Sequence, residues 1–295
     1  MAQKKLIIEE LEALNSIKAL AESYEEIAAV EMQKIRDSVL RTRAFLIDIS
    51  DVFVDLKASY IREVNDLILR RKKGDKTILP VLQKINKILL VYLSSNGKLY
   101  GPVTQKTFKL FSESLKKTDP NSTEIVIIGN AGKELFENSG IERSYEYFEI
   151  PDNKIDIGHI KKLMQKFLQY EKVYVYYGKF GNLVSQSPIS TSITGEDIFE
   201  TENLTPVSRE DRFIFEPTLE KIFHFFETQI MTNLFSQTLL ENQLARDVSR
   251  VNAMEEALIN IDIESKKLGR LGIRLKHAQQ NKKQLETISG LVLWS

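Results

Sequence analysis

The feature that most constrains this chain is a C-terminal stretch of 78 residues, 218–295, that contains no proline. The last proline is Pro217, and proline is favoured in the first turn of a helix because its missing N–H is not needed there. A helix from residue 217 to 293 would be roughly 115 Å long. No compact domain of this size needs such a helix, so the pattern indicates a helix that extends beyond a globular core.

Apolar and small residues recur along this stretch at alternating spacings of four and three. They are Val251, Met254, Leu258, Ile261, Ser265, Leu268, Gly272 and Leu275. Two such positions in every seven residues form the seam of a coiled coil. The pattern therefore predicts that the C-terminal helix packs against another helix along a narrow stripe.

The N-terminal segment predicts the second helix. Residues 4–71 contain neither proline nor glycine, and basic residues precede Gly74, as is usual at a helix C-terminus. The three-and-four spacing is carried here by Leu14, Ile17, Ala21, Tyr24, Ala28 and Ile35. We therefore expect a long antiparallel coiled coil of the N- and C-terminal helices, with boundaries at 1–73 and 214–295.

The middle of the chain, residues 74–213, has a different pattern. Short runs rich in β-branched and aromatic residues predict buried strands at residues 87–95, 123–130 and 171–178. Helical stretches near residues 103–117, 131–138 and 157–170 lie between them, and the polar residues 194–211 predict an exposed loop. Alternating strands and helices indicate a small central α/β sheet domain.

Composition excludes several classes of function. The 41 basic residues balance the 41 acidic ones, so no net charge attracts the chain to nucleic acid. With no cysteine there is no disulfide, thiolate metal site or cysteine nucleophile. The sequence contains no run of eighteen apolar residues, so we expect no membrane-spanning helix. We expect a cytoplasmic protein without a catalytic residue, metal or cofactor of its own.

Two features that could indicate a ligand have simpler explanations. The stretch 129–134, "GNAGKE", lacks the glycine and the Ser or Thr of a phosphate-binding loop and is more typical of a strand-to-helix turn. The three histidines, His159, His224 and His277, have no ligand-like spacing. A nucleotide-binding enzyme stays an alternative that nucleotide titration would test.

The chain resembles the gamma subunit of rotary F-type ATP synthases over nearly its whole length. The C-terminal helix carries a set of separate matches in one register: residues 239–241 ("LLE"), Arg250, Ala253, Met254, Ala257, Asn260, Leu268, Ala278, Glu286 and Gly290. The central domain adds four blocks in the family's order: residues 88–105, 126–136, 172–189 and 213–223. Several collinear matches identify the resemblance.

The resemblance implies a central-stalk rotor. In this family the paired helices fill a hexameric ring of alternating alpha and beta subunits, which hold the catalytic sites, and rotation couples ATP synthesis or hydrolysis to torque. It also implies an epsilon-like subunit, a membrane rotor ring and a location at the cytoplasmic face of the membrane. No nucleic acid is implied.

The resemblance also implies a ring-contacting surface at the end of the C-terminal helix. Its expected residues are Lys266, Lys267, Arg270, Arg274, Lys276, His277, Gln280 and Lys283. A solvated basic face without a partner would show the same pattern.

Two alternatives to a synthase rotor stay open. Glu22, Glu25 and Glu26 stand where the family is usually basic, and Lys276–His277 and Gln280–Asn281 replace its Arg-Gln and Ile-Thr pairs. These departures allow a gamma-like subunit of a specialised F-type-like ATPase, such as those linked to gliding or surface processes in mycoplasmas. The coiled coil alone would also suit a static adaptor between two assemblies.

Overall fold

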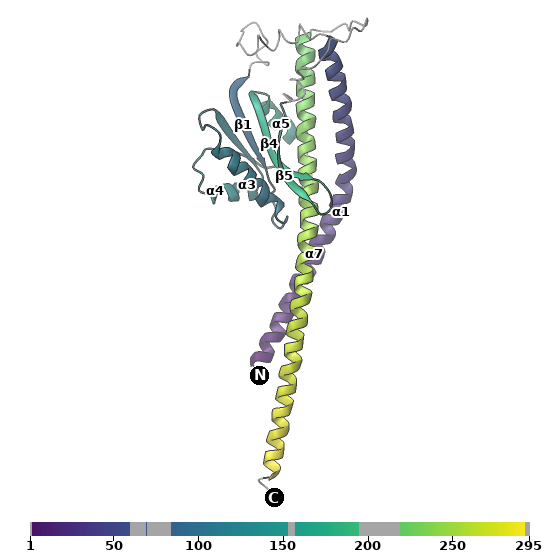
Figure 1. Ribbon diagram of the computed structural model, residues 1–295, viewed down its shortest axis with the longest axis vertical. Coiled ribbons are helices and arrows are strands. Elements are labelled where there is room, and N and C mark those ends of the chain that lie inside the picture. Colours follow the sequence, from purple (N-terminus) through teal and green to yellow (C-terminus); the bar gives the residue numbers. More distant parts are fainter. Residues whose placement is uncertain (1, 60–68, 70–83, 153–156, 195–218, 293–295) are drawn as a thin grey trace. The chain divides into compact units, whose positions relative to one another are not determined.

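The computed structural model describes residues 2–59, 69, 84–152, 157–194 and 219–292. Two long helices, α1 (Ala2–Ser59) and α7 (Leu219–Val292), come first and last in the chain and run in opposite directions (Figure 1). Long runs without proline permit such helices, since proline in a helix interior removes a hydrogen bond and clashes with the preceding turn. Three predicted features lie wholly or largely outside the described residues. They are the end of the first long helix near Gly74, the start of the second long helix at Pro217 and the loop of residues 194–211.

Between these helices the chain forms one five-stranded sheet in the order β3-β2-β1-β4-β5. Its strands are β1 (Ile85–Leu93), β2 (Thr123–Ile128), β3 (Glu146–Phe148), β4 (Tyr170–Phe180) and β5 (Gln186–Ser192). β2 and β4 pair parallel with β1, and β3 pairs parallel with β2. β5 pairs antiparallel with β4, so the sheet is mixed, with an antiparallel edge.

Alternate side chains of the central strands point into two separate cores. On one face, Leu90, Tyr92 and Ile127 pack with Phe111 of α3 (Val103–Lys116) and Phe136 of α4 (Asn130–Glu137). On the other, Leu89, Val91 and Val175 pack with a larger apolar set from α5 (Ile157–Phe167) and from α7: Ile160, Leu163, Met164, Phe167, Met231, Phe235 and Leu239. The N-terminal part of α7 is therefore a layer of the sheet domain.

The described chain divides into two compact units. One contains residues 31–249, and the other contains residues 1–30 and 250–295. The domain boundaries expected after residues 73 and 213 lie outside the described residues, and the division falls instead within both long helices. Each helix therefore contributes to two units.

The predicted fold class, a long antiparallel helix pair with a central α/β sheet domain, is confirmed. The three strands and three helices expected in the middle of the chain are present, within a few residues of the expected limits. β3 and β5 were not predicted. β3 has only three residues, and β5 contains Pro188 and five polar residues, a composition tolerated at a sheet edge. No helix within the described ranges meets the length and hydropathy needed to span a membrane.

Candidate functional site: the paired helices and the sheet junction

The expected seam residues of α7 lie along one stripe of the helix. Within the unit of residues 1–30 and 250–295, all eight expected positions are half-buried or buried, and Ile261 is only 8% exposed. Gly272 faces α1, since a Cβ built there would lie 3.8 Å from Cγ2 of Ile7. The small residue at this position thus lets a larger side chain of the other helix pack against it.

The seam of α1 differs from the expected one at two of its positions. In the α1 part of this unit the buried and half-buried residues, apart from Ala29 at its end, also alternate by four and three: Ile7, Leu11, Leu14, Lys18, Ala21, Glu25 and Ala28. Leu14 lies in this stripe, whereas Ile17 is 52% exposed and Tyr24 is 37% exposed. The structure corrects these two assignments, because the stripe runs through the neighbouring Lys18 and Glu25 instead.

Polar side chains in and beside the stripe explain this correction. Lys18 Nζ lies 3.2 Å from Asp262 Oδ1 of α7, and this ammonium holds the pKa of Asp262 below its usual range. A lysine can bury its aliphatic stem at a helix interface while its charged end reaches a partner outside. Tyr24 is exposed, but its ring makes a cation–π contact with α7, since the ring centre lies 5.4 Å from the guanidinium of Arg250.

The expected ring-contacting residues lie on the outside of α7. Lys266, Lys267, Arg270, Arg274, Lys276, His277, Gln280 and Lys283 are all exposed. Two of them make ion pairs along their own helix, Lys266 with Asp262 at 3.7 Å and Lys267 with Glu264 at 2.9 Å. From Lys276 to Ser289 every side chain is exposed. This surface is accessible within its unit and only weakly held by its own ion pairs.

The second feature is a junction between α7 and the sheet, within the unit of residues 31–249. Every residue from Glu241 to Ser249 is buried, although most of these residues are polar. Burying polar groups is unfavourable unless they are hydrogen-bonded. The partners of Arg246, Glu241 and Asn242 show how the cost is offset.

Arg246 binds two loops at the carboxyl ends of the strands. Its Nη1 donates to the carbonyl of Ser94 at 2.8 Å and to Asp152 Oδ1 at 3.0 Å, and its guanidinium lies 4.9 Å from the ring of Tyr100. The Asp152 carboxylate also accepts from the backbone N–H groups of Asn96 and Gly97, at 3.0 and 2.7 Å. One ion pair therefore ties the loop after β1 and the segment after β3 to α7.

Two further polar residues join α7 to β4 and to α1. Glu241 accepts from Arg43 Nε of α1 at 2.9 Å and from Gln237 Nε2 at 2.6 Å. Asn242 Oδ1 accepts from the backbone N–H of Gly178 at 3.0 Å. Two elements far apart in sequence, α1 and β4, are thus bonded to adjacent residues of α7.

Two glycines permit the close packing around this junction. A Cβ on Gly178 would lie 2.7 Å from Val103 Cγ2 and 3.5 Å from Ala245 Cβ. A Cβ on Gly101, whose φ is +67°, would lie 2.6 Å from the carbonyl oxygen of Ser249. A larger residue at Gly101 would collide with α7, and one at Gly178 would collide first with Val103 of α3.

The junction also fills the place where open α/β sheets bind ligands, the crevice at the carboxyl ends of the strands where their order reverses. Here that crevice lies between β1 and β4, and a cavity of about 20 Å³ lined by Ser94, Asp152, Asn242 and Arg246 is found beside it. That volume suits about one water molecule. α7 thus fills the position at which open α/β sheets usually bind a ligand.

The first amides of α4, within the "GNAGKE" stretch, are bonded to the protein. The N–H of Ala131 donates to the carbonyl of Ser95 at 2.8 Å, and the N–H of Asn130 donates to Asn96 Oδ1 at 3.1 Å. A phosphate would need these same donors. The stretch is therefore a strand-to-helix turn, as the sequence favoured.

The sequence did not single out the junction residues. Residues 241–250 interrupt the apolar pattern with Glu241, Asn242, Gln243, Arg246 and Asp247, which is typical of a solvated helix face. The one available signal was that the four-and-three seam starts only at Val251. A long helix without an apolar stripe must bury its polar residues against specific partners or leave them in water.

Comparison with known proteins identifies the class. A sequence model of the family described as ATP synthase matches residues 3–290. The chain is 21% identical to the ATP synthase gamma chain of Chloroherpeton thalassium, over 98% of this chain and 97% of that one. It is 22% identical to the ATP synthase gamma chain of Ruthia magnifica, over 98% and 99% of the two chains. The chain therefore belongs to the ATP synthase family, and the relatives named here are its gamma chains.

Solved structures show the same fold. A chain of the Euglena gracilis mitochondrial ATP synthase, in the OSCP/F1/c-ring structure, matches with a TM-score of 0.64 and 14% identity, covering 99% of this chain and 94% of that chain. A chain of the rotor of the same enzyme matches with a TM-score of 0.61 and 13% identity, covering 94% and 99%. The chain thus shares its fold with these proteins although their sequences are only 13 to 14% identical to it.

Proposed function

We propose that this chain is the gamma-type, central-stalk rotor subunit of a rotary F-type ATP synthase or ATPase. The observation that carries the proposal is that one helix, α7, contributes to both a buried polar junction with the sheet and a narrow seam with an accessible outer surface. A rotor needs both, because torque must pass between its base and its shaft while the shaft turns against its surroundings.

The two surfaces suit these tasks in different ways. The junction holds α7 through buried, charge-assisted hydrogen bonds, and breaking a buried ion pair costs about 3 to 5 kcal/mol. The outer surface of the paired helices presents exposed charges, each worth about 0 to 1 kcal/mol in a contact. Strong bonds at the base resist slipping, and weak exchangeable contacts let the shaft turn.

The partners follow from the same proposal. Alpha-like and beta-like subunits would form the ring that surrounds the helix pair and would carry the catalytic sites, so this chain supplies no catalytic residue. An epsilon-like subunit and a membrane rotor ring would bind its base. The chain would then work at the cytoplasmic face of a membrane as a peripheral part of the complex.

The exposed basic residues are the proposed contact surface with the ring. Neutralising Lys266, Lys267, Arg270 and Arg274 together should change ATP turnover or its coupling while leaving the helix content unchanged by circular dichroism, because all four side chains are exposed. Normal turnover and coupling in this variant would remove these residues from the contact surface.

Purification tests the function itself. The chain, isolated from its own cells through an affinity tag, should bring down alpha-like and beta-like ATPase subunits in a complex that hydrolyses ATP. Mass spectrometry would name them. Recovery of the chain without any such subunit would refute the proposal. Since a static adaptor could also co-purify, a covalent cross-link between α7 and a ring subunit separates the two: it should stop turnover of a rotor and leave that of an adaptor unchanged.

A further inference from the structure

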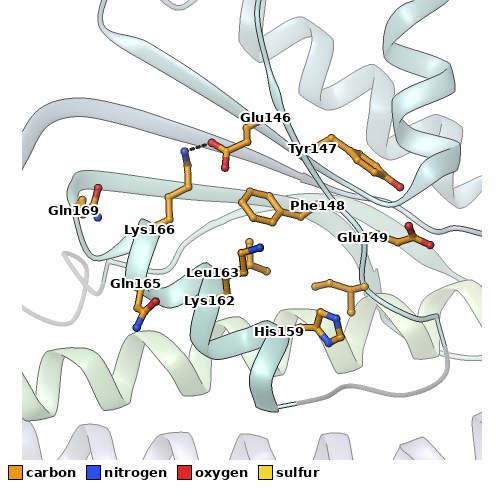
Figure 2. Close-up of a pocket in the computed structure, with 11 residues that line it drawn as sticks. Glu146, Tyr147, Phe148, Glu149, His159, Lys162, Leu163, Gln165, Lys166 and Gln169 are labelled. Carbon is orange, nitrogen blue, oxygen red and sulfur yellow. Dashed lines mark hydrogen bonds and ion pairs between the residues drawn. The ribbon is translucent and has the colours of Figure 1, made fainter.

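A groove runs between strand β3 and helix α5, away from the junction with α7. One wall is the strand segment of residues 146–150, and the other is α5 with the turn that follows it (Figure 2). The helix wall presents these residues: His159, Lys162, Leu163, Gln165, Lys166 and Gln169. The groove has a volume of about 600 Å³ and is open to solvent.

The strand wall is an edge of the sheet. β3 is the terminal strand in the order, and its residues Glu146, Tyr147 and Phe148 pair with Val126, Ile127 and Ile128 of β2 on one side only. The backbone groups on the other side of such a strand form a template for an added strand. Five successive residues line the groove, which is enough for a short extended segment to follow the strand.

The floor and walls of the groove define the chemistry that it would accept. The floor is apolar, with the half-buried Phe148 between Leu163 and Ile150, which are 1% and 7% exposed. One end is closed by an ion pair between Lys166 and Glu146 (Figure 2).

The Lys162 ammonium lies 5.9 Å from the centre of the Phe148 ring. No carboxylate of the described chain forms an ion pair with it. The Lys162 ammonium is therefore available to pair with a negative charge on a bound segment.

We propose that the edge of β3 binds an extended segment of a neighbouring polypeptide in the assembly, which adds a strand to the sheet. Side chains two residues apart on a strand point to the same face. The segment therefore carries an apolar side chain against Phe148 and, two residues away, an acidic one toward Lys162. Main-chain hydrogen bonds supply the affinity in such strand addition, and the side chains supply the specificity.

Amide hydrogen exchange tests this inference, which rests on the proposed function because it needs the assembly. Exchange is measured on the free chain and on the chain within the purified complex. Strand addition should slow, by at least tenfold in the complex, those amides of residues 146–150 that point away from β2, such as the N–H of Tyr147. Equal rates in the two samples would overturn the inference, as would protection in the free chain that depends on its concentration, since that indicates a second copy as the occupant.

Two charge reversals sharpen the test. Lys162→Glu should remove most of the protection, whereas Lys161→Glu, at an exposed neighbour that does not line the groove, should leave it intact. Lys162→Gln should give an intermediate loss and guards against misfolding of the reversed variant. Protection that survives Lys162→Glu would refute the acidic contact.

The two proposals fail in different ways. A complex that contains the ring subunits but leaves residues 146–150 unprotected overturns only the strand addition. A chain that assembles with no ATPase subunit overturns both proposals.

Discussion

Two segments of the single helix α7 are used in opposite ways. From Glu241 to Ser249 every side chain is buried, and Glu241, Asn242 and Arg246 are bonded to the sheet domain and to α1. From Lys276 to Ser289 every side chain is exposed. The two segments have similar polar compositions, but only residues 241–249 form the junction with the sheet domain, which we call the anchor. The second segment forms an outer surface, and only the partners of each residue distinguish the two.

The difference between the two segments of α7 predicts that removing an arginine lowers the free energy of unfolding more in the buried segment than on the exposed surface. Arg246→Met should lower the free energy of unfolding by about 3 kcal/mol, because it leaves the Asp152 carboxylate, 15% exposed, without its cation. Urea denaturation followed by circular dichroism measures the loss. The matched variant Arg270→Met, at an exposed position, should stay within about 0.5 kcal/mol of the parent. Equal effects of the two variants would contradict the anchor.

A methyl group at the anchor should be unfavourable. Gly178→Ala places a Cβ 2.7 Å from Val103 Cγ2, so the strand must move, and overpacking of this kind costs about 1 to 3 kcal/mol. The shift should also weaken the bond from the Gly178 N–H to Asn242, which faster hydrogen exchange of that amide would reveal. A variant with parental stability and exchange would show that β4 is not packed this closely against Val103 of α3 beside the junction.

The same change outside the anchor should be favourable. Gly269→Ala adds a Cβ with nothing within 4 Å, so the variant should gain about 1 kcal/mol from better helix propensity. Thermal unfolding of the isolated chain measures it. Gly272→Ala is the companion variant, since its Cβ would make an ordinary 3.8 Å contact with Ile7. A loss of stability in Gly269→Ala would mean that this position is packed more closely than the structure shows.

The smallest effect concerns the ion pair across the helix seam. Lys18 is the main cause of the lowered pKa of Asp262, so Lys18→Met should raise that pKa toward the usual aspartate value, as carboxyl NMR titration would record. Because the pKa is lowered by folding, the contribution of the pair is present above the ordinary aspartate pKa and is lost as the pH falls through the lowered value. Lys5→Met, which removes a lysine paired with Glu9 on the outside of α1, should leave the Asp262 titration unchanged.

The sequence predicted regular features better than specific ones. The α7 seam from Val251 to Leu275 follows from periodicity alone, because a repeating stripe can bury only one face of a helix. In α1 the expected Ile17 and Tyr24 are exposed, whereas Lys18 and Glu25 are half-buried, and the Lys18 ammonium reaches Asp262 at the edge of the interface.

The anchor could not be predicted in this way. Arg246 and Asp152 are 94 residues apart, and no local pattern links them. Their pairing depends on where the sheet brings the loops after β1 and β3. β3 was missed for a related reason, because three residues are too few to show an alternating pattern.

Rotation is the most direct test of the central claim. The chain has no cysteine, so Val184→Cys, at a side chain 87% exposed in the turn between β4 and β5, provides one attachment point for an optical probe. With the ring subunits immobilised on a surface, ATP should drive continuous rotation of the probe in one direction, and the probe should stop when ATP is removed. A probe that stays still while the same complexes hydrolyse ATP would contradict the account.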